Sequence, residues 1–315
     1  MNKEIVLAAD LGGTNLRMAA IDRRGKILFQ TKGETPRGEN SEEIVRAIAE
    51  AAAVCRENCS DYKVKALLAA VPGTIRGGVT LKAPNLPALN DFQLAAALET
   101  ELGIKVALEN DANAAATGEN WLGASKDFAD SICITLGTGV GGGVIVDGKI
   151  LRGADGAAGE IGHICVEPHG ALCNCGARGC VEQYSSATAI VRLAKELKTR
   201  FPKSILDTDS PFTSLEVYRA GTEADKLALE VFRQMGFYLG VAVANLINVL
   251  NPHAVVIGGG AAAGWNLFVP HLKETLRERV YSETARKTPI LPARLGDNAG
   301  IIGAARLAFG LPDLT

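Results

Sequence analysis

The chain contains an internal repeat, and this feature restricts its possible folds more than any other. Residues 11–12 and 136–137 both read Leu-Gly, 125 residues apart, and Gly-Lys-Ile-Leu occurs at 25–28 and again at 148–151. Around these matches both copies follow the same plan of strand, glycine turn, strand and turn. The repeat therefore predicts two related α/β halves, each with a glycine-rich hairpin.

Strand and helix patterns alternate along both halves, which is typical of α/β layers with mixed sheets. With 315 residues and about 150 residues per domain, two domains are expected. We predict a small domain over 1–117 with a C-terminal helix at 298–315, and a large domain over 118–297. The main predicted strands lie at 4–10, 16–22, 26–31, 64–71, 104–109, 131–136, 142–147, 254–258 and 289–294, and the main predicted helices at 41–58, 91–102, 224–250 and 262–279.

Composition excludes several classes of protein. A formal net charge of -2 gives no basis for binding nucleic acid or an anionic membrane. The most apolar helical stretch, residues 240–250, is shorter than a membrane span. The N-terminal MNKEIVLAAD does not resemble a signal peptide, and an odd total of seven cysteines suits a reducing compartment. We expect a cytoplasmic protein with neither a nucleic-acid nor a membrane partner.

The two glycine turns carry residues suited to phosphate. Gly12-Gly13-Thr14 and Gly137-Thr138-Gly139 each offer backbone N–H groups and a hydroxyl, and glycine permits both positive φ and close approach to an anion. For either turn taken alone, a tight hairpin without a ligand is the favoured interpretation. As a matched pair, with the acid Asp10 beside the first, they favour a polyphosphate ligand.

Two common nucleotide motifs do not apply. Residues 137–142 match the spacing G-x-G-x-x-G, but a strand pattern follows instead of the helix that a dinucleotide fingerprint requires. The P-loop pattern ending in Gly-Lys-Ser/Thr is absent from the sequence. A dehydrogenase is therefore not expected.

Asp111 is the candidate catalytic base. It follows a predicted strand and precedes an alanine-rich helix, so it could simply be an N-cap. The carboxyl end of a strand is also where open α/β sheets bind ligands, and phosphoryl transfer to a hydroxyl needs one carboxylate to accept the proton.

One imidazole and three thiols lie within eighteen residues: His163, Cys173, Cys175 and Cys180. This ligand set is typical of a closed structural zinc site. A disulfide from Cys180 to Cys173 or Cys175 is the alternative, but such bonds belong to oxidising compartments.

Five motifs together resemble the ROK family of sugar kinases and repressors, most closely its bacterial glucokinases. They are DLGGTN (10–15), ENDANAAA (109–116), LGTGVGGG (136–143), EIGH (160–163) and CNCGARGCVE (173–182). The resemblance extends from the first strand to the last helix. It implies an actin-like, ribonuclease-H-like two-domain fold, in agreement with the duplicated halves.

The resemblance also implies roles for individual residues. Both turns would bind ATP phosphates through Gly12, Gly13, Thr14, Asn15, Gly137, Thr138 and Gly139, with Gly258 and Gly259 beside the nucleoside. Asp10 would lie near Mg²⁺, and Asp111 would act as the base. The sugar would contact Asn85, Asn110, Asp111, Glu160, His163 and Glu182. His163, Cys173, Cys175 and Cys180 would bind zinc, with the second imidazole nitrogen of His163 free for a sugar hydroxyl.

The implied activity is ATP-dependent phosphorylation of a hexose at its 6-hydroxyl, with glucose as the expected sugar and a homodimer as the expected assembly. The alternative sugars are N-acetylmannosamine, N-acetylglucosamine, mannose, fructose and allose. A sugar-responsive, non-catalytic ROK regulator is a further alternative. The first strand pattern begins at residue 4, so a preceding DNA-binding segment is not expected.

Overall fold

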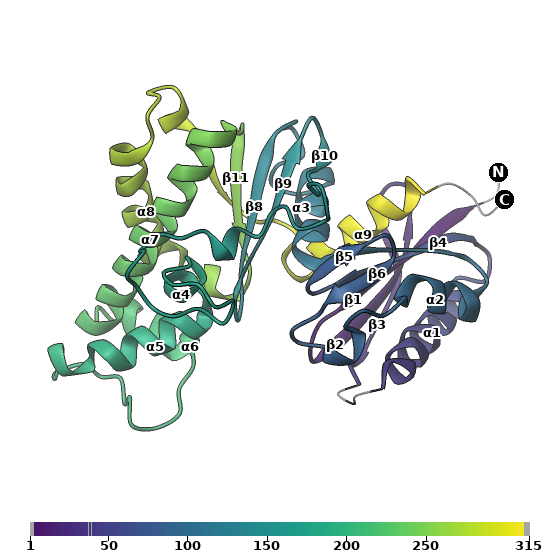
Figure 1. The fold of residues 1–315 in the computed structure, drawn as a ribbon, viewed down its shortest axis with the longest axis horizontal. Helices are drawn as coiled ribbons and strands as arrows, with labels where there is room; N and C mark the ends of the chain where they lie inside the picture. The colour runs from purple at the N-terminus through teal and green to yellow at the C-terminus, as the bar shows by residue number, and fades with distance from the viewer. Residues whose placement is uncertain (1–2, 37, 39, 312–315) are drawn as a thin grey trace. The chain divides into compact units, whose positions relative to one another are not determined.

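Three separated segments of the chain fold together into a first unit, and the two segments between them form a second (Figure 1). Unit 1 comprises Met1–Ala129, Gly143–Gly159 and Arg294–Thr315, and unit 2 comprises Asp130–Gly142 and Glu160–Ala293. The computed structural model describes residues 3–36, 38 and 40–311.

The first sheet has five strands in the order β3-β2-β1-β4-β7. β1 pairs antiparallel with β2 and parallel with β4, and β4 pairs parallel with β7. The carboxyl ends of β1, β4 and β7 therefore meet at one edge of the sheet. The strands are β1 (Glu4–Leu11), β2 (Asn15–Asp22), β3 (Ile27–Glu34), β4 (Lys63–Val71) and β7 (Lys105–Asn110).

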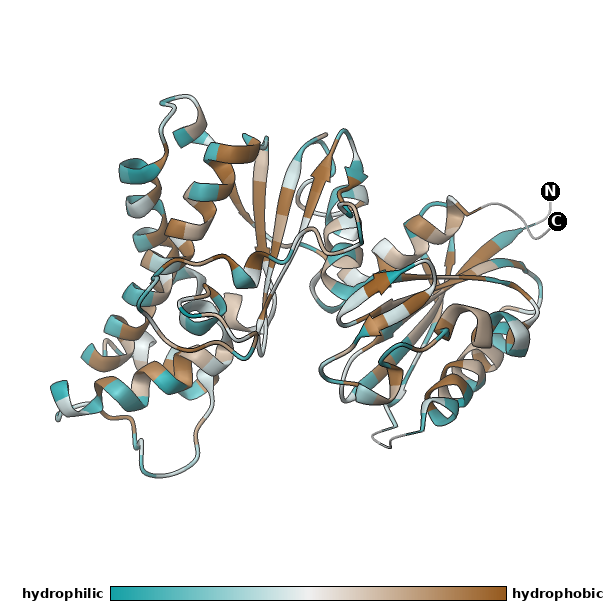
Figure 2. Ribbon diagram, in the orientation of Figure 1, coloured by the Kyte–Doolittle hydropathy of each residue, from teal (hydrophilic) through white to brown (hydrophobic). Residues whose placement is uncertain are grey.

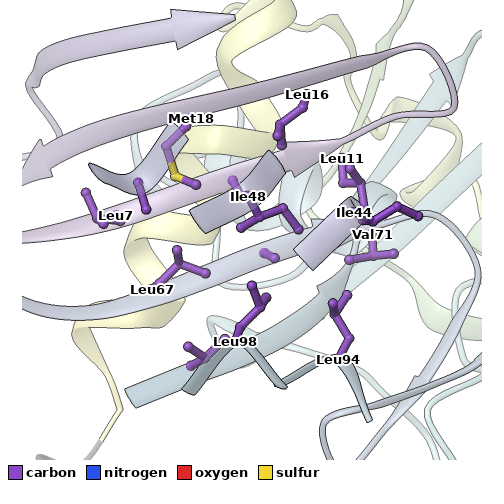
Figure 3. Close-up of a cluster of buried hydrophobic side chains, with 14 of the residues drawn as sticks. Leu7, Leu11, Leu16, Met18, Ile44, Ile48, Leu67, Val71, Leu94 and Leu98 are labelled. Carbon is purple, nitrogen blue, oxygen red and sulfur yellow. The ribbon is translucent and has the colours of Figure 1, made fainter. Parts of the chain in front are cut away.

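Apolar side chains on successive residues of β1 enter different cores, because side chains alternate across a strand. Leu7 and Leu11 pack with α1 (Ser41–Asn58) and α2 (Leu94–Leu102), as Figure 3 shows around Ile48 and Leu98. Val6 belongs to the other core, which is covered by α9 (Ala299–Phe309). Both faces of β1 are therefore buried, and the site-bearing end of the strand is held firmly.

The second sheet repeats the topology of the first. Its order is β10-β9-β8-β11-β12, with β11 parallel to both β8 and β12, so each strand has a counterpart in the first sheet. Asp147 and Gly148 have φ of 50° and 71°, as the two-residue hairpin turn between β9 and β10 requires. The duplication is confirmed. The strands are β8 (Ser131–Leu136), β9 (Val140–Val146), β10 (Lys149–Ile150), β11 (Ala254–Gly258) and β12 (Ile290–Pro292).

The longest helix, α7 (Lys226–Leu250), is the core helix of unit 2. Gly236 and Gly240 let it pack closely on α8 (Trp265–Arg279), because a Cβ at either position would overlap with α8. With 25 residues, α7 is long and apolar enough to cross a membrane, whereas residues 240–250 alone are too short. However, 67% of the most apolar window of α7 is buried inside the protein. Core helices share these properties. The strands β8 and β11 are mostly hydrophobic in Figure 2.

Several elements had no counterpart in the sequence prediction. A small hairpin, β5 (Thr74–Arg76) and β6 (Val79–Lys82), extends beyond β4. Three helices follow the cysteine-rich segment: α4 (Glu182–Ser185), α5 (Ala187–Leu197) and α6 (Ser214–Thr222).

The unit boundaries differ from the predicted domains at 117/118 and 297/298. Helix α3 (Asp111–Trp121) continues past residue 117 and packs on α9, where a Cβ on Gly118 would overlap the Ala299 carbonyl oxygen. Residues 118–129 and 143–159 therefore belong with unit 1. The predicted C-terminal helix ends at Phe309, and residues 312–315 lie outside the described residues.

A fully buried carboxylate, Glu119, ties α3 to the chain entering α9. It accepts hydrogen bonds from the backbone N–H groups of Ala124 (2.7 Å), Arg294 (3.0 Å) and Leu295 (2.8 Å). Hydrogen bonds to the charged form stabilise a buried carboxylate. Glu119 thus fixes both segments of unit 1 that lie next to the unit boundaries at 129/130 and 293/294.

Replacing Glu119 with Ala is expected to lower the free energy of unfolding by about 3–5 kcal/mol, because buried N–H donors lose their acceptor. Urea denaturation followed by circular dichroism measures this loss. Glu50→Ala, at an exposed position of α1, serves as the control. If the urea midpoint of Glu119→Ala equals that of the control, Glu119 does not hold these two segments together.

Candidate functional site

The first glycine turn connects β1 to β2 and is closed by a hydrogen bond from Gly12 N–H to Asn15 O (2.9 Å). Thr35 braces it, donating its hydroxyl to Gly12 O at 2.7 Å. A Cβ on Gly13 would lie 3.2 Å from the Asn85 Cβ, so the Asn85 side chain lies directly against the turn. The structure thus brings a predicted phosphate residue and a predicted sugar residue together.

Asp10 and Asp111 emerge at the same edge of the first sheet. Asp10 lies opposite Ala70 of β4, which lies opposite Glu109 of β7, two residues before Asp111. Burial raises the pKa of Asp10 to about 6; the Arg17 guanidinium opposes this rise and the Asp111 carboxylate adds to it. Burial also raises the pKa of Asp111, against the effect of the Ala112 N–H.

Asn110, not Asp111, caps α3. Its side-chain oxygen accepts from the N–H groups of Ala112 (2.9 Å) and Asn113 (3.1 Å), while its amide nitrogen donates to Gly73 O at 3.0 Å. Asp111 is the first residue of the helix. The N-cap interpretation of Asp111 is therefore wrong, and its carboxylate is not needed to begin the helix.

The second glycine turn joins β8 to β9 and is fixed by neighbours from unit 2. Ala187 N–H donates to Gly137 O (2.8 Å) and the Thr188 hydroxyl donates to Thr138 O (2.8 Å). Glu182 accepts from Val140 N–H at 3.0 Å, and a Cβ on Gly139 would overlap with this carboxylate.

Gly13 and Gly139 are required for space, because a Cβ there would press on Asn85 or overlap Glu182, whereas a Cβ on Gly12 or Gly137 would meet only ordinary contacts. None of Gly12, Gly13, Gly137 and Gly139 adopts positive φ, which corrects that part of the sequence argument. Gly259 does, with φ of 88°, and a Cβ there would overlap the Leu136 backbone. The pair Gly258–Gly259 thus lies beside the strand that enters the second turn.

The four predicted metal ligands converge. The ligand atoms of His163, Cys173, Cys175 and Cys180 all lie within 4.8 Å of one another. His163 Nδ1 is 3.8 Å from Cys173 Sγ, and the sulfurs of Cys175 and Cys180 are 3.6 Å apart. Tetrahedral zinc with bonds of about 2.3 Å separates its sulfur ligands by about 3.8 Å, so the arrangement fits. No disulfide joins these cysteines.

Charge at the cysteine cluster is unevenly placed. The N–H of Ala177 lowers the pKa of Cys175, whereas burial raises the pKa of Cys180 to about 12. A cation bound to the cluster would oppose this rise, because it would stabilise the Cys180 thiolate.

Glu182 connects the cysteine cluster to the second turn. One of its oxygens lies 4.0 Å from Cys173 Sγ and the other accepts from Val140 N–H. Glu160 directly precedes the 3-10 turn that ends at His163, whose N–H donates to Glu160 O (3.1 Å). Unit 2 therefore gathers the cluster, both glutamates and the second turn, whereas Asn85, Asn110 and Asp111 belong to unit 1.

Sequence reasoning missed residues that contact the predicted ones. Arg17 lies near Asp10 and donates to Asp297 O at 2.7 Å, and the backbone of Gly300 packs on the Asp10 carboxylate. The sequence signal for Asp297 and Gly300 was the run Gly-Asp-Asn directly before a final helix that contains glycine. Glu109 was also missed, although an acid directly after the apolar residues 106–108 was a visible signal.

Comparison with known proteins gives a consistent result. The model of the ROK family matches residues 6–310. A glucokinase of Halalkalibacterium halodurans is 37% identical over 98% of this chain and 96% of its own, and one of Thermotoga maritima is 35% identical over 98% of both. The crystal structure of a ROK family glucokinase from Streptomyces griseus, in complex with glucose and AMPPNP, is 35% identical with a TM-score of 0.83, over 98% of this chain and 100% of that one.

Proposed function

The chain belongs to the ROK family, and from this premise we propose that it is an ATP-dependent hexose kinase that phosphorylates glucose at the 6-hydroxyl. One observation carries the proposal. In a chain similar to glucokinases over nearly its whole length, the carboxylates of Asp10 and Asp111 and the first glycine turn share one edge of a sheet.

Asp111 is the proposed general base. As the sugar 6-oxygen attacks the γ-phosphorus, its proton passes to the Asp111 carboxylate, the bond to the β-phosphate oxygen breaks, and ADP leaves. Burial and a raised pKa make this carboxylate a better proton acceptor than an exposed aspartate. The capped helix start holds it in place.

The two turns are the proposed ATP-phosphate contacts, through Gly12, Gly13, Thr14, Asn15, Gly137, Thr138 and Gly139, and Gly258–Gly259 is the proposed nucleoside contact. The Asp10 carboxylate, with Asp111 and Asp297 within electrostatic range, suits Mg²⁺, which prefers oxygen ligands. Bound with ATP, Mg²⁺ neutralises charge on the phosphates.

The sugar contacts are proposed to be Asn85, Asn110, Asp111, Glu160, His163 and Glu182. His163, Cys173, Cys175 and Cys180 are proposed to hold a structural zinc, which orders the segment that carries three of these contacts. A homodimer and a cytoplasmic location remain predictions.

A coupled assay of ADP release tests the proposal. With ATP as donor, glucose is expected to give the highest kcat/KM in a panel with mannose, fructose, allose, N-acetylglucosamine and N-acetylmannosamine, and phosphorus NMR should identify a 6-phosphate. Polyphosphate as donor should be included. A higher kcat/KM with another sugar would correct the substrate alone. Binding of a sugar without any turnover would favour the regulator alternative.

A further inference from the structure

Glu109 is a buried acid, 5% exposed, at the carboxyl end of β7. One of its oxygens accepts from the Asn110 N–H (3.1 Å) and from the side-chain amide of Asn113 (3.0 Å). The other accepts from two nitrogens of Arg152, Nε at 2.8 Å and Nη2 at 2.6 Å. The carboxylate is thus held on both sides.

Arg152 comes from the segment that follows β10, 43 residues away in sequence. This segment is itself ordered, because Ala158 N–H donates to Arg152 O (3.1 Å) and Gly156 packs against Ile75 O. The guanidinium therefore approaches Glu109 from a fixed position. A buried carboxylate requires such a partner, since an unpaired buried charge is costly.

The residues that Glu109 holds flank Asp111 in the sequence. Asn110 precedes it and caps α3, and Asn113 follows it by two residues in the first turn of the helix. We propose that Arg152 is a positioning residue for Asp111: through Glu109 it fixes the strand-to-helix turn that aims the catalytic carboxylate. This inference rests on the proposed kinase function.

The effect of removing Arg152 should be kinetic more than structural. A cavity of about 220 Å³ is lined by Glu109, Asn110 and Arg152, among others. Without the guanidinium, water can enter there and solvate the Glu109 carboxylate, so the fold survives. The carboxylate is then free to turn away from Asn110 and Asn113, and Asp111 loses its fixed orientation.

We expect Arg152→Ala to lower kcat about 10- to 100-fold, since a displacement of about 1 Å in a catalytic group can cost 100-fold. The KM for ATP should stay within about twofold of wild type. Arg152→Lys should recover part of the loss, because an ammonium supplies the charge without the planar fork. The matched control is Arg233→Ala: Arg233 is 50% exposed and pairs with Glu230 at 2.7 Å, much as Arg152 is 52% exposed and pairs with Glu109.

A double-mutant cycle separates positioning from simple loss of an ion pair. Glu109→Gln alone turns an amide donor toward the guanidinium, so it should also lower kcat. In the Arg152→Ala background the same change should add little, because the two residues act as one unit. Steady-state kinetics in which ATP is varied at saturating glucose gives kcat and the KM for ATP, and thermal unfolding of each variant gives its stability.

The outcomes are distinguishable. If wild type turns over a hexose and Arg152→Ala matches Arg233→Ala in kcat, the positioning role is wrong and the kinase proposal stands. A loss of kcat accompanied by a melting temperature far below that of the control, without recovery in Arg152→Lys, would show a structural role and also overturn it. A wild type inactive on every hexose would defeat the proposed function, and this inference with it.

Discussion

Replacing Asp111 with Asn is expected to lower kcat by about two to four orders of magnitude while leaving a folded protein that still binds hexose. The amide keeps the shape of the carboxylate and an oxygen that can accept from Ala112 N–H, which Asp111 does at 2.9 Å. It cannot accept the proton of the attacking hydroxyl. Because Asn110 caps α3, the helix start remains intact.

The stability of this variant has a predictable sign. Burial raises the folded-state pKa of Asp111 above its ordinary value. The Asp111 carboxyl therefore stabilises the folded state at low pH, where it is protonated. This stabilisation is lost as the pH rises through the folded-state pKa. Above the folded-state pKa the wild type buries a charge and the variant does not. Asp111→Asn should therefore be at least as stable as wild type above that pKa, with the difference shrinking as the pH falls through it.

The measurements are kcat in the coupled assay, glucose binding by calorimetry, and thermal unfolding at pH 5 and pH 7. Asp61→Asn, an exposed aspartate between α1 and β4, is the control for handling and assay. Near-normal turnover in Asp111→Asn would remove this residue from its role as base. A large loss of stability at neutral pH would instead mean that the carboxylate has a structural partner.

The duplicated architecture could be predicted because its signals are local. Strand alternation and turn residues fix the hairpins, and helix α1 begins at Ser41 and ends at Asn58, as predicted, with Asn40 as its cap. In the β5–β6 hairpin, β5 has three residues and β6 has four. Strands this short show little periodic pattern in the sequence. The position of the hairpin is set by packing that is distant in sequence, such as Gly156 against Ile75 O.

The candidate site was predictable where the chemistry lies in one motif. The four metal ligands fall within eighteen residues, and their convergence in space was expected from ligand type and spacing. The contacts between motifs were not: Glu182 against Val140 and Arg152 on Glu109 join residues 42 and 43 positions apart. The glycine turns show the same limit, because their need for glycine comes from side chains such as Asn85 and Glu182 that pack on them.

The cysteine cluster holds the segment that carries proposed contacts to the sugar and a support of the proposed phosphate turn. Residues 163–181 contain little regular structure, only the end of one 3-10 turn and two isolated β-bridges, so their conformation depends on a few backbone bonds and on the proposed metal. Glu182 follows Cys180 by two residues and contacts the second glycine turn through Val140. If the cluster opens, both a proposed sugar contact and a support of the proposed phosphate turn are released.

Replacing Cys175 with Ala is therefore expected to remove bound zinc, raise the KM for glucose about 10- to 100-fold, raise the KM for ATP by a smaller factor, and lower the melting temperature. Zinc content by mass spectrometry of the purified protein, expected at one ion per chain in wild type, is measured beside the kinetics. Cys165→Ala is the matched control, because Cys165 is also exposed and lies in the same segment but outside the cluster.

A Cys175→Ala protein that keeps its zinc and an unchanged KM for glucose would show that the metal does not hold the sugar contacts. If only the KM for glucose rises, the metal orders Glu160 and His163 but is not needed for Glu182 to support the phosphate turn.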